Sequence, residues 1–362
     1  MTERKIRISF ILPGRGTKPV GGFRVVYEYA NRLSAAGFDV QLIHTAWLFK
    51  RNPFVDGVIR YLYCLFFYRF IQPWFTLDRS VKNKWIFAPY NFLLPDADFV
   101  VATSWETAEH VAGFPARKGR KLYLIQANES EFTYVSNKGL EEASLETWKL
   151  PMHKIAICTW LQEKIKDYSG QDSTVIFNGL NFDEFFIEPG IKRKKNTVMM
   201  LHHHSPHKGS AEGLSALRLL KNRVKDLQVI LYGMPAAPDG LEEWMKYYQM
   251  PDRKELRRLY NEATIFLSPS HSEGWGLPVS EAMQCGCLAV TSDIGGFKDF
   301  VRNGETACCF PVGDVESMAA ILQELLLDDE KREQLAKQGH AFIQQFTWDR
   351  AVADFIKILK MQ

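Results

Sequence analysis

Apolar residues along this chain occur in short runs that alternate with longer segments of helical spacing. The first run, residues 5–12, has the apolar character of a buried strand, and residues 39–44 repeat it. Between them lie a glycine-rich loop at 13–22 and an amphipathic segment at 23–38, in which Gly37 is placed to end a helix. This order of strand, loop, helix and strand is typical of an open parallel α/β sheet.

The same alternation continues along the chain and divides it into two series. Further strands are predicted at 97–103, 121–126, 154–159 and 173–179, and a second series at 197–202, 227–233, 264–270 and 287–293. Residues 187–196 combine Pro-Gly with four consecutive basic residues, which favours a solvated linker over a nucleic-acid contact. We therefore expect two α/β domains, at 1–186 and 187–345, followed by a helical segment at 346–362.

Length and composition agree with two globular domains and exclude several classes of protein. The 362 residues carry a net charge of +3, which is too mild to indicate nucleic-acid binding. The six cysteines form no C-x-x-C pair and are expected to be free thiols in a reducing compartment. The N-terminus lacks the apolar core and cleavage site of a signal peptide, so a cytoplasmic protein is expected.

The segment from Ser268 to Gly296 carries the most specific chemistry in the sequence. Two glutamates, Glu273 and Glu281, lie eight positions apart and flank a Gly-Trp-Gly-Leu-Pro turn. Pro278 is placed to begin a helix, and helix N-termini bind phosphate because their first N–H groups lack partners. The segment therefore offers an anion site beside two carboxylates that can accept hydrogen bonds from hydroxyl groups.

This string resembles the Glu-x7-Glu signature of retaining glycosyltransferases with the GT-B fold, a family that includes sucrose synthase and mannosyltransferases. The matching positions are Ser268-Pro269-Ser270, Glu273-Gly274, Gly276-Leu277-Pro278, Glu281-Ala282-Met283, Gly286 and Ser292-Asp293-Ile294-Gly295-Gly296. Weaker matches occur at Gly21-Gly22-Phe23, Asn178-Gly179-Leu180-Asn181, Phe185, Lys208-Gly209, Asn303-Gly304-Glu305 and Pro311-Val312-Gly313-Asp314. The alternative to the resemblance is an ordinary βαβ unit with surface acids.

The resemblance implies a fold of two Rossmann-like domains that face each other across a cleft. The N-terminal domain would bind the acceptor, and the C-terminal domain would bind a nucleotide sugar. Phe346-Thr347-Trp348 resembles the point at which the family's last helix crosses back to the N-terminal domain.

The resemblance also implies a role for each matched residue. Glu273 would contact the donor sugar hydroxyls, and Glu281 would accept hydrogen bonds from the ribose. The donor diphosphate would be met by Lys208 and by the N–H groups of Gly21, Gly22, Gly274, Trp275, Gly276 and Leu277. The family retains the anomeric configuration and needs neither a metal nor another cofactor, so the expected ligand is a dTDP-, UDP- or GDP-sugar.

The chain departs from the family pattern at two positions. An arginine that often precedes the lysine by six residues is replaced by His202, which offers one donor in place of a charged fork. His203, His204, Arg15 and Arg24 are the candidates to supply the missing charge. In the first domain, the place of a family histidine is taken by Gln126 or Glu129, or by an ordinary polar strand end.

Two patterns suggest a metal at first sight. His202, His203, His204 and His207 are clustered, but no cysteine or carboxylate lies close to them in the sequence. Asp96 and Asp98 match the Asp-x-Asp of a different glycosyltransferase fold, but follow Pro95 at the start of a strand and are expected to be exposed turn acids. No metal site is predicted.

Residues 50–84 combine basic and aromatic character. They hold seven basic and two acidic residues, a net charge of +5, and their longest uncharged run is too short to span a bilayer. The segment is either an amphipathic helix that lies on an anionic membrane or a helix packed on the N-terminal domain.

A short string at 102–108, with Lys118-Gly119 and residues 123–126, resembles a subgroup that builds surface polysaccharides from dTDP-rhamnose. Trp105 and Glu106 within it are candidates for the acceptor site, and Trp105 alternatively belongs to the core.

The expected function is therefore sugar transfer to a glycan or lipid-linked acceptor. The alternatives are a non-catalytic glycan-binding relative and an epimerase or phosphorylase on the same fold. A dinucleotide dehydrogenase is excluded because Pro19 breaks the glycine fingerprint.

Overall fold

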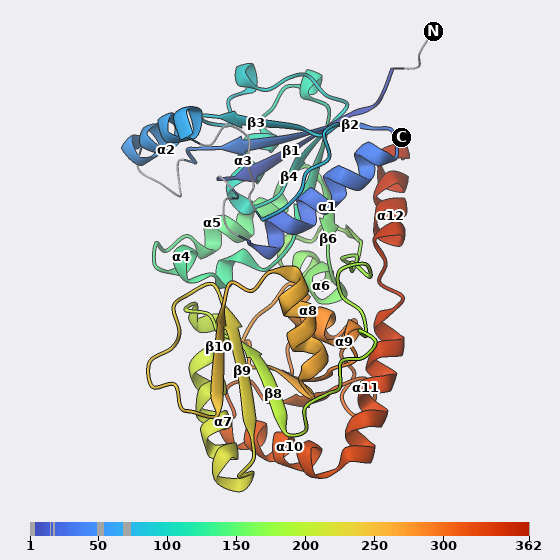
Figure 1. Cartoon of the computed structure of the whole chain (residues 1–362). Helices are drawn as coiled ribbons and strands as arrows, with labels where there is room; N and C mark the ends of the chain where they lie inside the picture. The colour runs from blue at the N-terminus through green and yellow to red at the C-terminus, as the bar shows by residue number, and fades with distance from the viewer. Residues whose placement is uncertain (1–3, 15, 17–18, 49–53, 68–73, 362) are drawn as a thin grey trace. The chain divides into compact units, whose positions relative to one another are not determined.

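The computed structural model describes residues 4–14, 16, 19–48, 54–67 and 74–361. The chain forms two compact units, of which the first comprises residues 1–178 and 349–362 and the second residues 179–348 (Figure 1). Each unit is built on its own parallel sheet, which confirms the predicted α/β class. The units divide at Asn178 and Gly179, a few residues before the position expected from the sequence.

The described part of the first unit contains a sheet of seven parallel strands in the order β3-β2-β1-β4-β5-β6-β7. The strands are β1 (Arg7–Pro13), β2 (Asp39–Thr45), β3 (Lys82–Ile86), β4 (Phe99–Ala102), β5 (Arg120–Ile125), β6 (His153–Ala156) and β7 (Ser173–Val175). Phe10 of β1 lies opposite Leu42 of β2 and Val101 of β4, and all three are fully buried. Burial on both faces explains why these strands are continuous apolar runs in the sequence.

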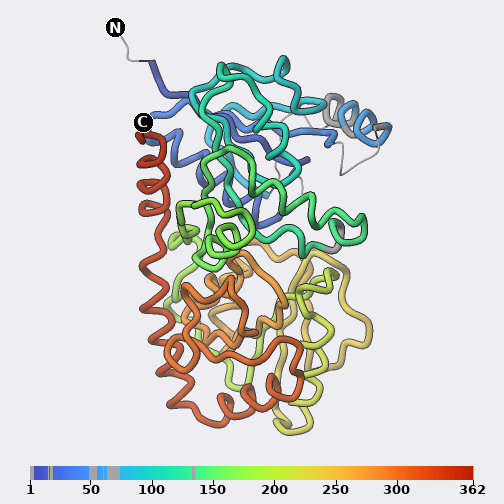
Figure 2. Tube along the Cα trace, turned by 180° about the vertical axis from the view of Figure 1, so that it is seen from behind, coloured from blue at the N-terminus to red at the C-terminus, as the bar shows by residue number. Residues whose placement is uncertain are grey.

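The helices of this unit come from both ends of the chain. They are α1 (Gly21–Ala35), α2 (Phe54–Phe67), α3 (Trp105–Ala112), α4 (Thr133–Ser136), α5 (Glu141–Glu146), α6 (Thr159–Ser169) and α12 (Trp348–Lys360). In both views α12 lies beside α1 (Figures 1 and 2). The ring of Phe355 in α12 lies 5.1 Å from that of Tyr29 and 6.0 Å from that of Phe10, so the predicted return of the last helix to the N-terminal domain is confirmed.

The second unit repeats the architecture with six described strands in the order β10-β9-β8-β11-β12-β13, all parallel. The strands are β8 (Thr197–Leu201), β9 (Gln228–Gly233), β10 (Met245–Gln249), β11 (Ile265–Ser268), β12 (Leu288–Ser292) and β13 (Cys308–Phe310). The helices are α7 (Ser210–Arg223), α8 (Arg253–Glu262), α9 (Leu277–Gln284), α10 (Val315–Leu327) and α11 (Asp329–Ile343). The core is formed by fully buried residues such as Val198, Leu231, Leu267, Val290 and Leu322.

The strand order of each sheet reverses at one point, and these points locate the candidate chemistry. The reversal falls between β1 and β4 in the first unit and between β8 and β11 in the second. Ligands of open α/β sheets bind outside the carboxyl ends of the strands at such a switch point. In the first unit these ends lead into the glycine loop before Gly21, and in the second they lead to Lys208 and Glu273.

The structure contains elements that the hydrophobic pattern does not reveal. Strands β3 and β10 are edge strands with several exposed or half-buried residues, so neither appears as an apolar run. The basic segment 187–196 is only partly solvated, because the Arg193 guanidinium donates to the carbonyl oxygens of Tyr260 and Ala263. Residues 50–84 form α2 over Phe54–Phe67, and 49–53 and 68–73 lie outside the described residues.

Replacing Phe355 by alanine is expected to lower the free energy of unfolding of the first unit by about 3–5 kcal/mol, the usual cost of removing a buried ring. Urea denaturation followed by circular dichroism measures this loss. The control is Lys360→Ala on the same helix, where the side chain is exposed and the expected change is within about 0.5 kcal/mol. Equal effects of the two substitutions would show that α12 does not stabilise this unit.

Candidate functional site

Lys208 and Glu273, far apart in the sequence, meet at the switch point of the second sheet. The Lys208 ammonium donates to Glu273 Oε1 at 2.7 Å, and the Ser270 hydroxyl donates to the same oxygen at 3.0 Å. Both charged side chains are mostly buried, at 22% and 14% exposure. They line a small recess together with Leu201, Ser268, Ser270, Gly276 and Pro278. A carboxylate and an ammonium that share a sheltered recess can each bind a polar ligand group if their contact opens.

Glycines make this convergence sterically possible. Gly209 has φ of +63°, and a Cβ at this position would lie 2.0 Å from the Pro269 carbonyl oxygen. A Cβ at Gly276, φ +80°, would lie 2.2 Å from the Phe297 ring. The backbone segments that carry Lys208 and Glu273 therefore approach more closely than any other residue type would allow.

The turn before α9 is largely buried. Gly274, Trp275 and Gly276 are buried, whereas Leu277 and Pro278 are half-buried. The Trp275 ring packs against Phe300 at 5.0 Å and Phe346 at 5.1 Å, so its indole belongs to the core. Gly276 caps α9 without a side-chain hydrogen bond. In the first turn Pro278 has no N–H, and the N–H groups of Val279 and Ser280 donate to the Gly276 carbonyl, so the Leu277 N–H is the group that can meet a ligand.

Glu281 lies in α9 and has a different set of partners from Glu273. Its residue is 7% exposed, and its Oε1 accepts a hydrogen bond from the Arg253 guanidinium at 2.9 Å. Its Oε2 lies 3.5 Å from the Tyr260 hydroxyl, which in turn lies 2.7 Å from the hydroxyl of Tyr232. Arg253 was not predicted, because it follows a loop with no recognisable motif.

His202 follows β8 directly and is buried with 6% exposure. Neither of its ring nitrogens has a hydrogen-bond partner among the described residues, and its ring lies against His204 and Tyr247. Burial lowers the pKa of His202, and burial together with Lys208 lowers the pKa of His203 to about 4. Both rings are therefore neutral at pH 7 and do not replace the permanent charge of an arginine.

Metal ligation finds no support in the described part of the chain, where no cluster of three or more His, Cys, Asp or Glu side chains has a suitable arrangement. Asp96 accepts from Lys118 at 2.9 Å, and Asp98 pairs with Arg4 at 2.9 Å and with the N–H of Arg7. These two acids therefore stabilise the amino ends of the strands, opposite to the switch point.

In the first unit, the structure brings Gly22 and Gln126 together. A Cβ at Gly22 would lie 3.4 Å from Gln126 Nε2, and the same nitrogen lies 3.4 Å from the Thr103 carbonyl oxygen. Gly21 and Gly22 begin α1, where no side chain caps the helix. Glu129, the alternative to Gln126, instead accepts the N–H of Trp105 at 2.7 Å at the start of α3.

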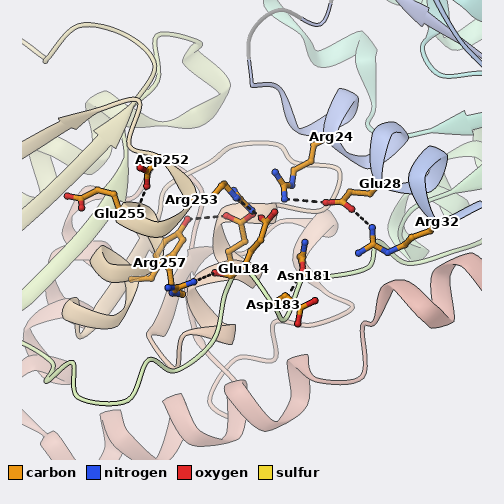
Figure 3. Close-up of polar contacts among 12 residues, drawn as sticks. Arg24, Glu28, Arg32, Asn181, Asp183, Glu184, Asp252, Arg253, Glu255 and Arg257 are labelled. Atoms are coloured by element: carbon orange, nitrogen blue, oxygen red, sulfur yellow. Dashed lines mark hydrogen bonds and ion pairs between the residues drawn. The ribbon is translucent and has the colours of Figure 1, made fainter. Parts of the chain in front are cut away.

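The remaining candidates of the first unit are tied to structural partners. The Arg24 guanidinium donates to Glu28 at 3.2 Å, and Arg32 pairs with the same carboxylate (Figure 3). Trp105 and Glu106 are both buried, so Trp105 belongs to the core. Arg15 lies outside the described residues.

Two aromatic side chains that the sequence analysis did not identify contact the carbonyl oxygens of Gly14 and Gly16. His44 Nδ1 lies 2.9 Å from the Gly14 carbonyl oxygen and must carry the proton, since a carbonyl only accepts. Trp74 Nε1 donates to the Gly16 carbonyl at 2.8 Å. Burial lowers the pKa of His44 to about 4, so this clamp keeps the same protonation over the physiological range.

Comparison with known proteins places these features in a family context. Residues 181–342 match the family described as Glycosyl transferases group 1. Over 200 residues the chain is 26% identical to a phosphatidyl-myo-inositol mannosyltransferase of Mycobacterium leprae, covering 52% of this chain and 54% of the relative. Over 120 residues it is 32% identical to O-antigen chain mannosyltransferase B of Escherichia coli, covering 33% and 31%. The chain spans about half the length or less of these curated relatives.

Solved structures match the whole fold. Sucrose-phosphate synthase from Thermosynechococcus elongatus has a TM-score of 0.76 at 15% identity, with 98% of both chains covered. HepE from Anabaena, in complex with UDP and glucose, has a TM-score of 0.72 at 17% identity, covering 98% of this chain and 99% of that one. The chain has the GT-B fold, as predicted, and the match to the group 1 glycosyltransferase family covers residues 181–342, under half of the chain.

Replacing Gly209 by alanine is expected to destabilise the second unit by more than about 2 kcal/mol, because a carbonyl clash adds to the strain of a left-handed backbone. Gly313→Ala is the matched control. Gly313 has φ of +76° but no atom within 4 Å of an added Cβ, so only the backbone cost of about 1–2 kcal/mol is expected. Equal losses in urea denaturation would contradict a special role of the close approach to Pro269.

Proposed function

We propose that this chain is a retaining glycosyltransferase that moves a sugar from a nucleotide diphosphate to a glycan or lipid-linked acceptor. The observation that carries the proposal is the Lys208–Glu273 contact at the switch point of the second sheet, beside the uncapped start of α9. Synthesis of a bacterial surface polysaccharide is the context that the relatives favour, since one is named for a phosphatidylinositol acceptor and another for the O-antigen chain.

The chemistry follows from the charges that develop as the donor bond breaks. Negative charge grows on the leaving diphosphate, and positive charge grows on the sugar. Lys208 and the N–H group of Leu277 would meet the phosphate, and removal of one such donor typically costs about 10²–10³ in rate. When Lys208 turns to the phosphate, Glu273 is released to hydrogen-bond the sugar hydroxyls and favour its cationic state.

The other predicted residues have supporting roles in this proposal. Glu281 would accept from the ribose hydroxyls, and His202, as a neutral ring, would donate one hydrogen bond to the nucleotide. In the first unit, the N–H groups of Gly21 and Gly22 would contact phosphate, and Gln126 would take the place of the family histidine beside the reacting sugar. Basic and backbone donors supply the charge compensation, so no metal or organic cofactor is proposed.

The donor is proposed to be a UDP-, GDP- or dTDP-sugar. HepE is a structural neighbour whose name includes UDP and glucose, and two of the curated relatives are named as mannosyltransferases. The rhamnosyl option rests on the short resemblance at 102–108. A thermal-shift screen against UDP, GDP and dTDP, with and without EDTA, separates these options, because a ligand that binds only the folded state raises the midpoint.

We also propose that α2 contacts an anionic membrane, which would place the protein on the inner face of the plasma membrane. Val55, Ile59 and Leu62 are 64%, 60% and 47% exposed and follow the spacing of one helical face. The surrounding sequence, 50–84, carries a net charge of +5. α2 stands out from its sheet in both views (Figures 1 and 2). No helix in the described ranges has the length and apolarity needed to cross a bilayer.

A non-catalytic glycan-binding relative is the second candidate, favoured by the absence of the family arginine at His202. The two functions differ in their response to substitution of Glu273. A binding protein would lose ligand affinity, whereas an enzyme would lose turnover.

Glu273→Gln is expected to lower kcat by about 10²–10³ while nucleotide affinity changes by less than about threefold. Glu281→Gln, the matched substitution, is expected to weaken nucleotide binding about tenfold with a smaller effect on kcat, since it loses one charge-assisted hydrogen bond. The measurement is nucleotide release from the donor identified by thermal shift, with calorimetry for binding. Full turnover by Glu273→Gln at saturating donor would overturn the catalytic assignment.

Ile59→Asp is expected to reduce binding to phosphatidylglycerol vesicles about tenfold or more, because burial of this side chain contributes about 1.5–3 kcal/mol. Val312→Asp is the control, an exposed apolar residue of the second unit with 45% exposure. Cosedimentation measures the bound fraction. The membrane contact would be contradicted if the wild-type protein did not bind anionic vesicles. It would also be contradicted if both variants bound them equally.

A further inference from the structure

We infer that Arg253 is a positioning residue for Glu281, which fixes one carboxylate oxygen so that the other is held for a nucleotide ribose. The inference rests on the proposed function, in which Glu281 contacts the ribose. It adds to that function a residue that no motif of the chain includes.

Arg253 uses three sides of its guanidinium. Nη2 donates to Glu281 Oε1 at 2.9 Å. Nε donates to Glu184 Oε2 at 2.8 Å, and Figure 3 shows Arg253 beside Glu184. Its flat face lies 4.1 Å from the centre of the Phe185 ring. The backbone is fixed as well, because Arg253 is the first residue of α8, capped by Asp252, which accepts the N–H of Glu255 at 2.7 Å. A planar fork held on two edges and one face has little freedom to reorient.

The charges around Glu281 make this contact strong. Burial alone would lower the pKa of Arg253, but Glu281 and Glu184 together raise it, so the guanidinium stays charged. Burial raises the pKa of Tyr260 and of Tyr232, which keeps both phenols neutral. Arg253 is therefore the cation that the structure shows in contact with the Glu281 carboxylate, and a buried carboxylate that loses its cation is strongly destabilised.

The two oxygens of Glu281 consequently differ. Oε1 is engaged by the guanidinium, whereas the contact of Oε2 within the described part of the chain is the long 3.5 Å one to Tyr260. Oε2 is thus the better acceptor for an additional hydroxyl, and its direction is set by the anchoring of Oε1. Without Arg253, the carboxylate would be free to rotate, and this weakens a charge-assisted hydrogen bond to ribose.

The same helix offers a matched control one turn later. Arg257 Nε donates to Glu188 Oε2 at 2.8 Å, and its guanidinium lies 4.3 Å from the centre of the Phe186 ring. Arg257 therefore reproduces the ion pair and the ring contact of Arg253, against the same segment of the chain. Arg257 Nη1 also donates to the Glu184 carbonyl oxygen at 3.2 Å, so both arginines hold this segment. Within the described residues Arg253 contacts Glu281 and Arg257 does not, and the comparison of the two therefore tests the Glu281 contact.

The experiment compares Arg253→Gln, Arg253→Lys and Arg257→Gln in the full chain. Isothermal calorimetry measures binding of UDP and of 2′,3′-dideoxyuridine diphosphate, with GDP and dTDP and their dideoxy forms as further probes. Arg253→Gln is expected to weaken the preferred nucleotide about ten- to hundredfold, the usual range for a hydrogen bond to a charged group. Arg257→Gln is expected to change it less than about twofold, and Arg253→Lys to fall between, since lysine reaches only one carboxylate well.

The ribose provides a second measurement that a purely structural role would not change. The wild-type preference for the nucleotide over its dideoxy form should disappear in Arg253→Gln and persist in Arg257→Gln. Circular dichroism confirms that each variant folds. If Arg253→Gln does not fold, the same nucleotide comparison is made with Arg253→Lys. Equal losses for the two glutamine variants, or retained discrimination in Arg253→Gln, would overturn the inference alone. Wild-type protein that binds none of the nucleotides would overturn the proposed function, and the inference with it.

Discussion

The contact between Lys208 and Glu273 is the interaction on which the candidate site depends. It joins the loops that follow β8 and β11, the two strands that flank the switch point of the second sheet. Gly209 makes the contact possible because it has a left-handed backbone and no Cβ. A Cβ at this position would lie 2.0 Å from the Pro269 carbonyl oxygen. Backbone geometry set by the sheet therefore determines which side chains can share the recess, and the side chains determine its chemistry.

The loops at the carboxyl ends of the strands are held by different interactions in the two units. In both sheets the polar groups gather at the carboxyl ends of the strands, where the strand order reverses. The second unit orders its loops by close glycine packing. In the first unit, His44 and Trp74 donate hydrogen bonds to the carbonyl groups of Gly14 and Gly16. His44 is buried and Trp74 is half-buried. The low pKa of His44 makes its bond insensitive to pH near neutrality.

Much of this arrangement could be predicted from the sequence, and the exceptions have physical causes. Buried strands such as β1 and β8 are apolar runs, and the Glu-x7-Glu string correctly places Glu273 and Glu281 around the start of a helix. Edge strands β3 and β10 escape detection because solvent on one side permits polar residues. The Arg253–Glu281 pair escapes because its partners are 28 positions apart and obey no local spacing. The packing of the Trp275 indole in the core is likewise set by distant partners, Phe300 and Phe346, that no local spacing reveals.

The partners of the two glutamates differ in a way that the proposed chemistry requires. Glu273 is paired with a lysine, a point charge on a flexible stem that can transfer from carboxylate to phosphate without breaking a fixed fork. Glu281 is paired with an arginine that also contacts Glu184 and Phe185 and is therefore held in place. A carboxylate that must be released when the donor enters is matched to a mobile cation, and one that must keep its direction is matched to a rigid cation. If the lysine and the arginine were exchanged, Glu273 would be held in place and Glu281 would be released. The proposed roles of the two glutamates therefore follow from their cationic partners.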